Sequence, residues 1–322
     1  MNAFVTGGTG FVGTHLVRRL LDRGDTVTCL VRDVAKARNL GWTAVRLVPG
    51  DLDNRDALRQ GCVGADIVYH VAGRISARNL SEFLAANRDG TAHVLEAATQ
   101  GGARRFVYVS SLAAAGPTVP GAPIDETRTP APVTDYGRSK LAGEELVRGA
   151  KLPWTVVRPP VVYGERDRET FKIFQLAQYR LGLLIGDGTQ ELSVIYVGDL
   201  ATALIAAGTT TSGAGRVYFA AHPQSTTSRG LVEAIGRALG TKPWILPIPG
   251  PLARGALWTI GSLAHLAGRA TVLSADKANE FLAPAWTCRA DALARDSGWR
   301  ATVDLDSGVQ RAASWYRTEG WL

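Results

Sequence analysis

A tyrosine and a lysine four residues apart, with two serines upstream, are the residues of this sequence best suited to acid–base chemistry. Tyr136 and Lys140 lie in the pentad Tyr-Gly-Arg-Ser-Lys, and residues at i and i+4 share one face of a helix. Ser110 and Ser111 end an apolar run that starts at Phe106. A nearby cation favours the phenolate, so we expect Lys140 to lower the pKa of Tyr136 from about 10. Such a tyrosine can exchange a proton with an alcohol or carbonyl oxygen, as hydride transfer requires.

A glycine cluster near the start of the chain is suited to binding phosphate. Gly7, Gly10 and Gly13 follow a short apolar run and precede a helical pattern that starts at Thr14. In a strand–turn–helix unit the first glycine can take φ > 0, the second lets phosphate approach the backbone, and the third lets helix and strand pack closely. The N-terminus of the helix then attracts an anion. The pattern therefore predicts a site for a dinucleotide pyrophosphate.

The end of the second apolar run bears on the identity of the dinucleotide. Arg32 and Asp33 directly follow the run Thr26–Val31. An acidic residue at this position pairs with the ribose 2′-hydroxyl of NAD, whereas an arginine pairs with the 2′-phosphate of NADP. Arg32 therefore favours NADP, and Asp33 is expected to cap the following helix. The alternative is that Arg32 only stacks on adenine, so that both NADP and NAD bind.

The order of the elements predicts an α/β fold. Apolar runs alternate with helical patterns through the first 160 residues, which is typical of a parallel sheet covered by helices on both faces. The carboxyl ends of such strands meet at one edge, where a dinucleotide binds. The expected strands are Ala3–Thr6, Thr26–Val31, Ala44–Leu47, Ile67–Val71, Phe106–Ser110 and Thr155–Arg158, with Val194–Leu200 and Arg216–Ala221 returning to the sheet later.

Seven motifs in this order resemble the extended short-chain dehydrogenase/reductase family, the NAD-dependent epimerase/dehydratase superfamily. They are Thr6–Gly13, Gly50–Leu52, His70–Gly73, Asn87–Thr91, Val109–Ser111, Tyr136–Lys140 and Val157–Gly164. The resemblance implies a Rossmann-type doubly wound parallel sheet in residues 1–164, completed by about residues 193–221. It also implies a smaller, mostly helical substrate-binding lobe made of residues 165–192 and 222–322.

The resemblance also implies the roles of individual residues. Tyr136 would be the acid/base, Lys140 would bind the nicotinamide ribose and tune Tyr136, and Ser111 would hold the reacting oxygen. The expected cofactor-binding residues are Gly7, Gly10, Phe11, Val12, Gly13, Arg32, Asp51, Leu52, Val71, Ala72, Gly73, Asn87, Val109, Tyr136, Lys140 and Pro160. Neither the resemblance nor the spacing of His, Cys, Asp and Glu predicts a metal.

The residues after Ser110 limit which reactions of this family the chain could catalyse. Dehydratases of this family place Thr-Asp-Glu where this chain has Ser111-Leu112-Ala113, so the carboxylates that eliminate water are missing. The apolar stretch 244–273 resembles a helical region of the 3β-hydroxysteroid dehydrogenase branch. We therefore expect an NAD(P)-dependent oxidoreductase that interconverts an alcohol and a ketone or aldehyde on a sterol-like or aromatic substrate. The alternatives are a nucleotide-sugar 4-epimerase and a regulator that binds the cofactor without turnover.

The stretch 244–273 has its own alternatives. Arg254, His265 and Arg269 interrupt it too often for a helix that crosses a bilayer. Part of it is periodic, with Leu257, Ile260, Leu263 or Ala264, and Ala267 on one helix face. It is either a helix pair packed on the core of the lobe, or an apolar cover over the substrate, or a peripheral membrane contact.

Composition limits the partners and the compartment. The 322 residues carry a formal charge of +7, but the basic residues form no run that would favour nucleic acid. The three cysteines are scattered, and the first expected strand leaves no room for a signal peptide, which together favour the cytoplasm. The expected partner is a small-molecule substrate, with a homodimer left open. The Pro- and Gly-rich stretch 113–134 has the length of a lid.

Overall fold

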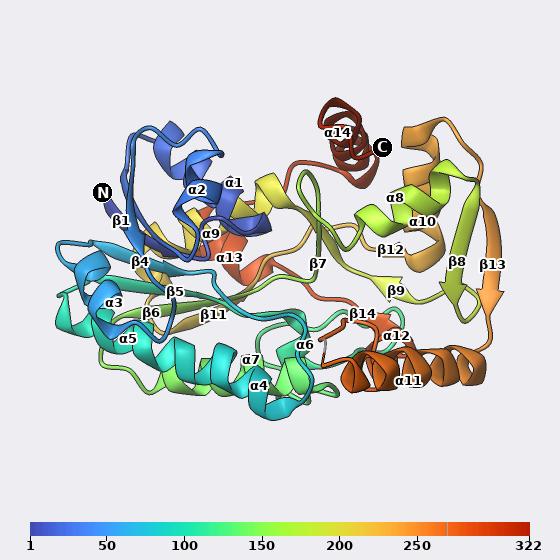
Figure 1. The fold of residues 1–322 in the computed structure, drawn as a ribbon, viewed down its shortest axis with the longest axis horizontal. Coiled ribbons are helices and arrows are strands. Elements are labelled where there is room, and N and C mark those ends of the chain that lie inside the picture. Colours follow the sequence, from blue (N-terminus) through green and yellow to red (C-terminus); the bar gives the residue numbers. More distant parts are fainter. Residues whose placement is uncertain (269) are drawn as a thin grey trace.

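A seven-stranded parallel sheet forms the centre of the computed structural model, which describes residues 1–268 and 270–322 (Figure 1). Arg269, a charge of the apolar stretch, lies outside the described residues. The strand order is β11-β6-β5-β4-β1-β2-β3, so the chain runs outward from β1 in both directions. The strands are β1 (Asn2–Thr6), β2 (Thr26–Val31), β3 (Val45–Pro49), β4 (Ile67–His70), β5 (Arg105–Val109), β6 (Trp154–Arg158) and β11 (Arg216–Phe219).

Helices cover both faces of this sheet, which confirms the Rossmann-type doubly wound fold (Figure 1). One face carries α1 (Phe11–Asp22), α2 (Val34–Arg38), α9 (Val197–Thr209) and α13 (Asp291–Ser297). The other carries α3 (Arg55–Cys62), α5 (Gly90–Gln100) and α7 (Asp135–Arg148).

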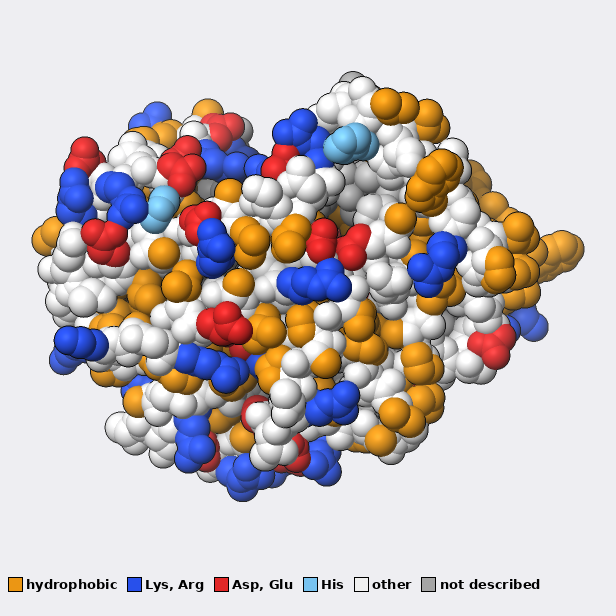
Figure 2. All heavy atoms as spheres, turned by 90° about the horizontal axis from the view of Figure 1, so that it is seen from below, with side chains coloured by type: hydrophobic (Ala, Val, Ile, Leu, Met, Phe, Trp, Pro, Cys, Tyr) orange, Lys and Arg blue, Asp and Glu red, His pale blue; other side chains and the backbone are white. Residues whose placement is uncertain are grey.

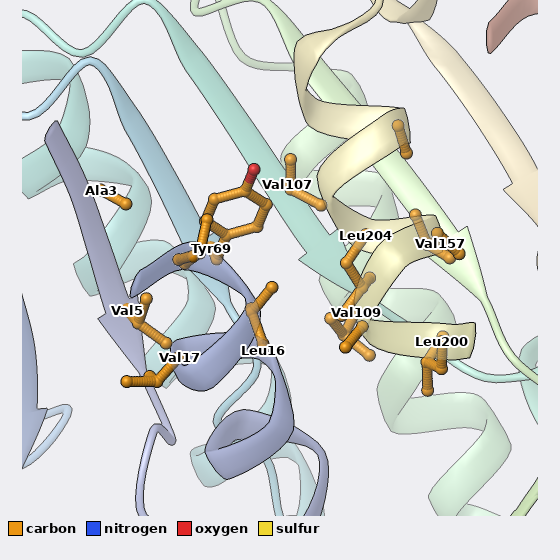
Figure 3. Packing of buried hydrophobic residues seen from close by; sticks show 14 of the residues in the cluster. Ala3, Val5, Leu16, Val17, Tyr69, Val107, Val109, Val157, Leu200 and Leu204 are labelled. Carbon is orange, nitrogen blue, oxygen red and sulfur yellow. The ribbon is translucent and has the colours of Figure 1, made fainter. Parts of the chain in front are cut away.

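The packing of α1 and α9 against the sheet shows why the strands are almost wholly apolar. In Figure 3, Leu16 of α1 and Leu204 of α9 lie over Val107 and Tyr69, and all four are fully buried. Strands buried on both faces need apolar side chains at every position, not at alternate ones. Each such side chain contributes roughly 1.5–3 kcal/mol to folding.

The expected strand Val194–Leu200 is wrong in its second half. β10 (Val194–Tyr196) pairs with β7 (Val161–Tyr163) in a separate two-stranded sheet, and α9 starts at Val197. Of the two later segments, only β11 joins the main sheet. The reason is that a short apolar run fits a buried strand and a buried helix turn equally well, so periodicity cannot place the boundary.

The rest of the chain forms a lobe beside the sheet, rich in helices with short strands between them (Figure 1). Its helices are α8 (Phe171–Gln178), α10 (Ser228–Leu239), α11 (Gly250–Leu266), α12 (Ala278–Phe281) and α14 (Leu305–Thr318). Its strands are β8 (Leu181–Ile185), β9 (Glu191–Leu192), β12 (Thr226–Thr227), β13 (Trp244–Ile248) and β14 (Ala285–Trp286).

Residues 291–301 differ from the expected assignment to the lobe. Leu293 of α13 and Trp299 belong to the apolar core under the main sheet, and the indole N–H of Trp299 donates to Thr202 Oγ1 of α9 at 3.0 Å. The chain thus returns to the sheet before α14. Sequence order alone did not reveal this return, because α13 is short and only Leu293 of it is buried.

The stretch 113–134, whose length suggested a lid, is bonded to the lobe at several points. Its first residues form the short helix α6 (Leu112–Ala115), and isolated bridges join Thr118 to Ala285 and Ile124 to Cys288. The hydroxyl groups of Thr118 and Thr287 lie 3.0 Å apart and are buried. These contacts fasten the stretch to the lobe across the end of the sheet.

Helix α11 is the least buried long helix of the lobe. Of its 17 residues only Ala253 and Leu257 are buried, so the expected face formed by Leu257, Ile260 and Leu263 does not pack on a core. Residues 244–248, expected to be helical, form strand β13 instead. Within the described residues, no helix is long and apolar enough to cross a membrane.

Candidate functional site

The predicted site residues gather at the carboxyl edge of the parallel sheet, because each follows the end of a strand. The glycine turn follows β1, Val71–Gly73 follow β4, Ser111 follows β5 and Pro160 follows β6. β1 and β4 are neighbours at the point where the chain changes direction along the sheet. A crevice opens at such a point in doubly wound folds.

The glycine turn has the geometry expected for phosphate binding. Gly7 has φ +74°, and a Cβ there would lie 2.6 Å from the backbone N of Ala72. A Cβ on Gly13 would lie 2.1 Å from the carbonyl oxygen of Gly7. Gly10, which precedes α1, offers no side-chain cap, so the first N–H groups of this helix, at Phe11 and Val12, remain available. Gly7 and Gly13 therefore let the turn, the loop after β4 and α1 pack closely, and the available N–H groups at the start of α1 fit an anionic dinucleotide.

Asn87 fastens the loop after β4 to the helix that carries Tyr136. Its side-chain amide donates to Arg74 O and Ser139 Oγ, both at 2.9 Å, and its Oδ1 accepts from Arg74 N at 2.7 Å. Asn87 is buried in a π-helical turn (Ala85–Asp89) that follows α4 (Leu80–Leu84). Its role in the structure is to position Val71, Ala72 and Gly73 against α7.

Lys140 is buried beside that loop. A Cβ on Gly73 would lie 3.5 Å from Lys140 Nζ, and the ammonium lies 4.4 Å from the centroid of the Tyr108 ring. Burial lowers the pKa of Lys140 to about 7, and Glu144, one turn further along α7, acts in the opposite direction. His70 lies nearby and serves the core: its ring bonds Thr6 and Thr91, and burial lowers its pKa to about 3.

The expected effect of Lys140 on Tyr136 is wrong for the structure as it stands. Burial raises the pKa of Tyr136 to about 12, the hydrogen bond between the side chains of Ser111 and Tyr136 opposes this, and Glu280 adds to it. The reason is that the phenol is desolvated, and the other groups that act on its pKa are Ser111 and Glu280, not Lys140. Ser111 also caps α6 by accepting from Ala113 N at 3.1 Å, which fixes its hydroxyl at the end of β5, after Val109.

The structure contains a buried ion pair near Ser111 and Tyr136 that the sequence did not predict. Glu144, fully buried, accepts from Arg158 Nε at 2.8 Å and from its terminal nitrogen at 2.6 Å. Ser110 Oγ donates to the same carboxylate at 2.6 Å, and Arg148 reaches it at 3.2 Å. The pair joins α7 to β6 and to the serine strand. Its only signal in the sequence was an arginine inside a buried strand, where a charge needs a partner.

The residues expected beside the adenine and its ribose follow β2 and β3, the last two strands of the sheet. Arg32 is exposed after β2, and Asp33 caps α2 by accepting from Lys36 N at 2.9 Å, as predicted. Asp51 accepts from the backbone of Asp53 and Asn54 at 3.0 and 3.1 Å, which shapes the turn before α3. Leu52 is half-buried against Gly90. Pro160, expected near the nicotinamide, is half-buried after β6.

A cavity of about 480 Å³ lies beside the helix start that carries Tyr136. Phe83 forms part of its wall and lies 6.0 Å from Tyr136, ring to ring. Trp258 and Leu266 of α11 form the opposite side, and Asp135 and Asp276 contribute carboxylates. Asp276 accepts from the backbone N of Asp135 at 2.9 Å, so the segment before α12 is tied to the start of α7.

The residues at the edge fit a nicotinamide dinucleotide. The glycine turn and α1 would hold the pyrophosphate, and Lys140 and the loop 71–73 lie between the turn and Tyr136. Ser111 and Tyr136 present two hydroxyl groups, and Ser111 is close enough to lower the pKa of Tyr136. Such a pair can hold a carbonyl oxygen and give it a proton.

Known proteins share both the sequence and the fold. The NAD dependent epimerase/dehydratase family matches residues 3–221. The chain is 35% identical over 321 residues to a ceramide reductase of Caulobacter vibrioides, covering 99% of this chain and 95% of that protein. It is 29% identical over 305 residues to a 4-hydroxy-2-methyl-3-oxo-4-farnesyl-3,4-dihydroquinoline-1-oxide ketoreductase of Stigmatella aurantiaca, covering 88% and 91%.

A solved structure extends the likeness to the whole fold. The UDP-glucose 4-epimerase of Thermus thermophilus in complex with NAD superposes with a TM-score of 0.79 at 23% identity, over 98% of this chain and 99% of that one. At this identity the likeness concerns the fold alone. Together with the motifs and the edge geometry, these matches show that the chain belongs to the NAD dependent epimerase/dehydratase family, within the extended short-chain dehydrogenases/reductases.

Proposed function

We propose that this protein reduces the ketone of a lipid-like substrate to an alcohol with a nicotinamide dinucleotide. The observation that carries the proposal is the cavity beside Tyr136, because Phe83, Trp258 and Leu266 give it an apolar wall. The likeness to a ceramide reductase over nearly the whole chain supports an N-acylated long-chain lipid as the substrate class. The ketoreductase of Stigmatella aurantiaca, whose substrate carries a farnesyl chain, supports an apolar ketone in general.

The chain's own residues would supply the proton and the orientation. Ser111 would hold the carbonyl oxygen by a hydrogen bond, and Tyr136 would donate a proton to that oxygen as the carbon is reduced. A bound reduced dinucleotide supplies the hydride, so that one hydride and one proton convert the ketone to the alcohol. Lys140 would hold the nicotinamide ribose from its buried position. Because burial raises the pKa of Tyr136 to about 12, its proton stays on the oxygen until it is transferred.

The epimerase alternative requires the same edge to accept a nucleoside diphosphate. Two carboxylates, Asp135 and Asp276, line the cavity beside Tyr136, and burial raises the pKa of Asp276. Arg78, which could bind phosphate, is engaged by Glu82 in two ion contacts. Carboxylates repel a diphosphate, whereas a ketone and an apolar chain need neither cation nor anion. The cavity therefore favours the lipid substrate.

We also propose NADP as the preferred dinucleotide. Arg32 is exposed at the end of β2, and Asp33, which could otherwise bind a ribose hydroxyl, is engaged as a helix cap. Arg32→Ala should weaken NADP binding by roughly ten- to a hundredfold and leave NAD almost unchanged, since hydrogen bonds to charged groups contribute about 1.5–3 kcal/mol. Calorimetry with both dinucleotides measures this, and equal weakening of both would show that Arg32 only stacks on adenine.

The decisive assay compares substrates at one enzyme concentration. Consumption of NADPH and NADH is followed with a keto-ceramide, a sterol ketone and an aromatic ketone, and conversion of UDP-glucose, which consumes no dinucleotide overall, is followed by chromatography of its sugar product. We expect turnover of the lipid ketone, and its loss in Tyr136→Phe. Tyr179→Phe, at an exposed tyrosine, is the matched control and should turn over normally. Oxidised dinucleotide retained through purification, with conversion of UDP-glucose and no ketone turnover, would replace this proposal by the epimerase. Dinucleotide binding without turnover of any substrate would instead favour a regulator.

A further inference from the structure

The outer face of the β8–β13 ribbon is apolar where a sheet in contact with water should be polar. The register pairs Leu181 with Trp244 and Leu183 with Leu246, and all four side chains are exposed. Leu184, on the opposite face, is buried. A strand pair with one wet face normally alternates polar and apolar residues. Here the apolar side chains occupy both faces, and within the described residues nothing covers the outer one.

Helix α11 continues this surface. β13 leads into it through Pro249, at the right-hand end of the molecule in Figure 1. Its exposed side chains include Leu252, Leu263 and Leu266. Figure 2 shows hydrophobic side chains gathered over this end of the molecule. We call the exposed side chains of β8, β13 and α11 the apolar end. Apolar patches larger than a few hundred Å² are uncommon on proteins that stay free in solution.

The segments that form the apolar end carry charges of one sign, and the nearest carboxylates, Glu233 and Asp276, come from neighbouring segments. The sequence has no Asp or Glu from 170 to 186 or from 234 to 275, and these ranges include β8, β13 and α11. Arg180, Lys242 and Arg254 are exposed in the same ranges. Within the described part of the chain, none of the three forms an ion pair with a carboxylate. An apolar surface whose own segments carry unpaired cations and no carboxylate complements an anionic lipid surface.

We propose that the apolar end is an interfacial membrane-binding surface for anionic bilayers. Trp244 and Trp258 suit the level of the lipid headgroups, where amphipathic rings concentrate. A second copy of the chain is a poorer occupant. A two-fold interface would bury the same patch from both copies, so Arg180, Lys242 and Arg254 of both copies would enter one interface to which β8, β13 and α11 contribute no carboxylate.

The cavity beside Tyr136 opens at this same surface. Trp258 and Leu266 line the cavity and also belong to the apolar end. A lipid in the bilayer could therefore enter the cavity headgroup first while its chains remain in the membrane. This route of entry rests on the proposed function, whereas binding to the bilayer does not.

The test is flotation of the full chain with vesicles that contain no substrate. Vesicles of equal parts phosphatidylglycerol and phosphatidylcholine are compared with pure phosphatidylcholine. We expect binding to the anionic vesicles, at least tenfold weaker binding to the neutral ones, and weakening by salt. Trp244→Glu combined with Leu252→Glu should reduce binding at least tenfold. The two side chains are 76% and 67% exposed, so their replacement leaves the core intact.

A control variant, Val63→Glu, and measurements of folding and oligomeric state accompany the flotation test. Val63→Glu places the same charge at a valine that is 69% exposed outside the apolar end, and its binding should equal that of the unchanged protein. Circular dichroism checks that each variant is folded. Absence of binding to anionic vesicles would overturn the proposal. So would a dimer in sedimentation that the Trp244 and Leu252 substitutions dissociate, because the second copy would then be the occupant. Since the readout needs no turnover, a wrong substrate class leaves this result unaffected.

Discussion

Replacing Arg158 by methionine should expose how strongly the buried ion pair holds the site together. Arg158 is 1% exposed and gives Glu144 two hydrogen bonds, at 2.8 and 2.6 Å. Methionine fills much of the same volume but leaves the carboxylate with Ser110 and Arg148 as partners. Removing one partner of a buried pair costs about 3–5 kcal/mol, because the remaining charge stays desolvated. We expect the free energy of unfolding to fall by about this amount.

Arg148 provides the matched control within the same network. It reaches the same carboxylate at 3.2 Å but is 41% exposed, so water already screens it. Arg148→Ala should therefore cost less than about 1 kcal/mol, as for other surface pairs. The double variant Glu144→Leu with Arg158→Met removes both buried charges. It should lose less than Arg158→Met alone, since apolar replacements of buried pairs are often nearly neutral.

Urea unfolding without ligand, followed by tryptophan fluorescence and circular dichroism, measures these differences. Coincident transitions with both probes allow the free energies to be compared. The reasoning fails if Arg158→Met loses no more stability than Arg148→Ala. It also fails if the double variant loses the sum of the losses of Glu144→Leu and Arg158→Met measured singly, because that would mean that Glu144 and Arg158 do not act on each other.

Three further changes test the site itself. Tyr136→Phe should lower turnover by about a hundredfold or more with dinucleotide binding retained in calorimetry; near-normal turnover would contradict the assignment. Gly13→Ala should weaken dinucleotide binding more than tenfold, because its Cβ would lie 2.1 Å from Gly7 O, whereas Gly255→Ala, with nothing within 4 Å, should bind normally. The pKa of His70 is lowered from 6.5 to about 3, so the unfolded chain binds the extra proton between these values. Stability should fall as the pH is lowered below 6.5, by about 1.4 kcal/mol per pH unit for one group, and His70→Gln should flatten this slope in urea titrations at pH 4 to 6.

The parts of the site that follow from local geometry were predictable from the sequence. The glycine turn depends on the positive φ of Gly7 and on the close approach of Gly13, and both are properties of a strand–turn–helix unit that glycine spacing reveals. The cap by Asp33 is likewise local, three residues from its donor. Because parallel strands end at one edge, their order also predicts that the serines, the tyrosine and the glycines meet.

The parts that depend on tertiary surroundings were not predictable. The i,i+4 spacing of Tyr136 and Lys140 gave the wrong direction for the pKa of Tyr136, since burial of the phenol raises that pKa and Lys140 is not among the groups that act on it. The spacing of Lys140 and Glu144 resembles an exposed helix pair, and the true partner, Arg158, comes from a buried strand 14 residues further on. For α11 the apolar residues left three alternatives open, and the first of them, a face packed on the core, is not what the structure has, since only Leu257 of that face is buried.

The contacts around Tyr136 are therefore of two kinds: buried polar contacts among the elements that carry the hydroxyl groups, and few contacts that hold helix α11. Below Tyr136, the Glu144–Arg158 pair and the bonds of Asn87 join four elements through buried groups, and moving any of them would leave polar atoms without partners. Above it, α11 is held by two buried side chains, and Asp276 ties the segment that follows it to the backbone of Asp135. The proposed reaction needs the hydroxyl groups of Ser111 and Tyr136 held in place. It also needs a surface through which a lipid substrate can enter. The buried contacts of Glu144, Arg158 and Asn87 meet the first need of the proposed chemistry, and the exposed side chains of α11 meet the second.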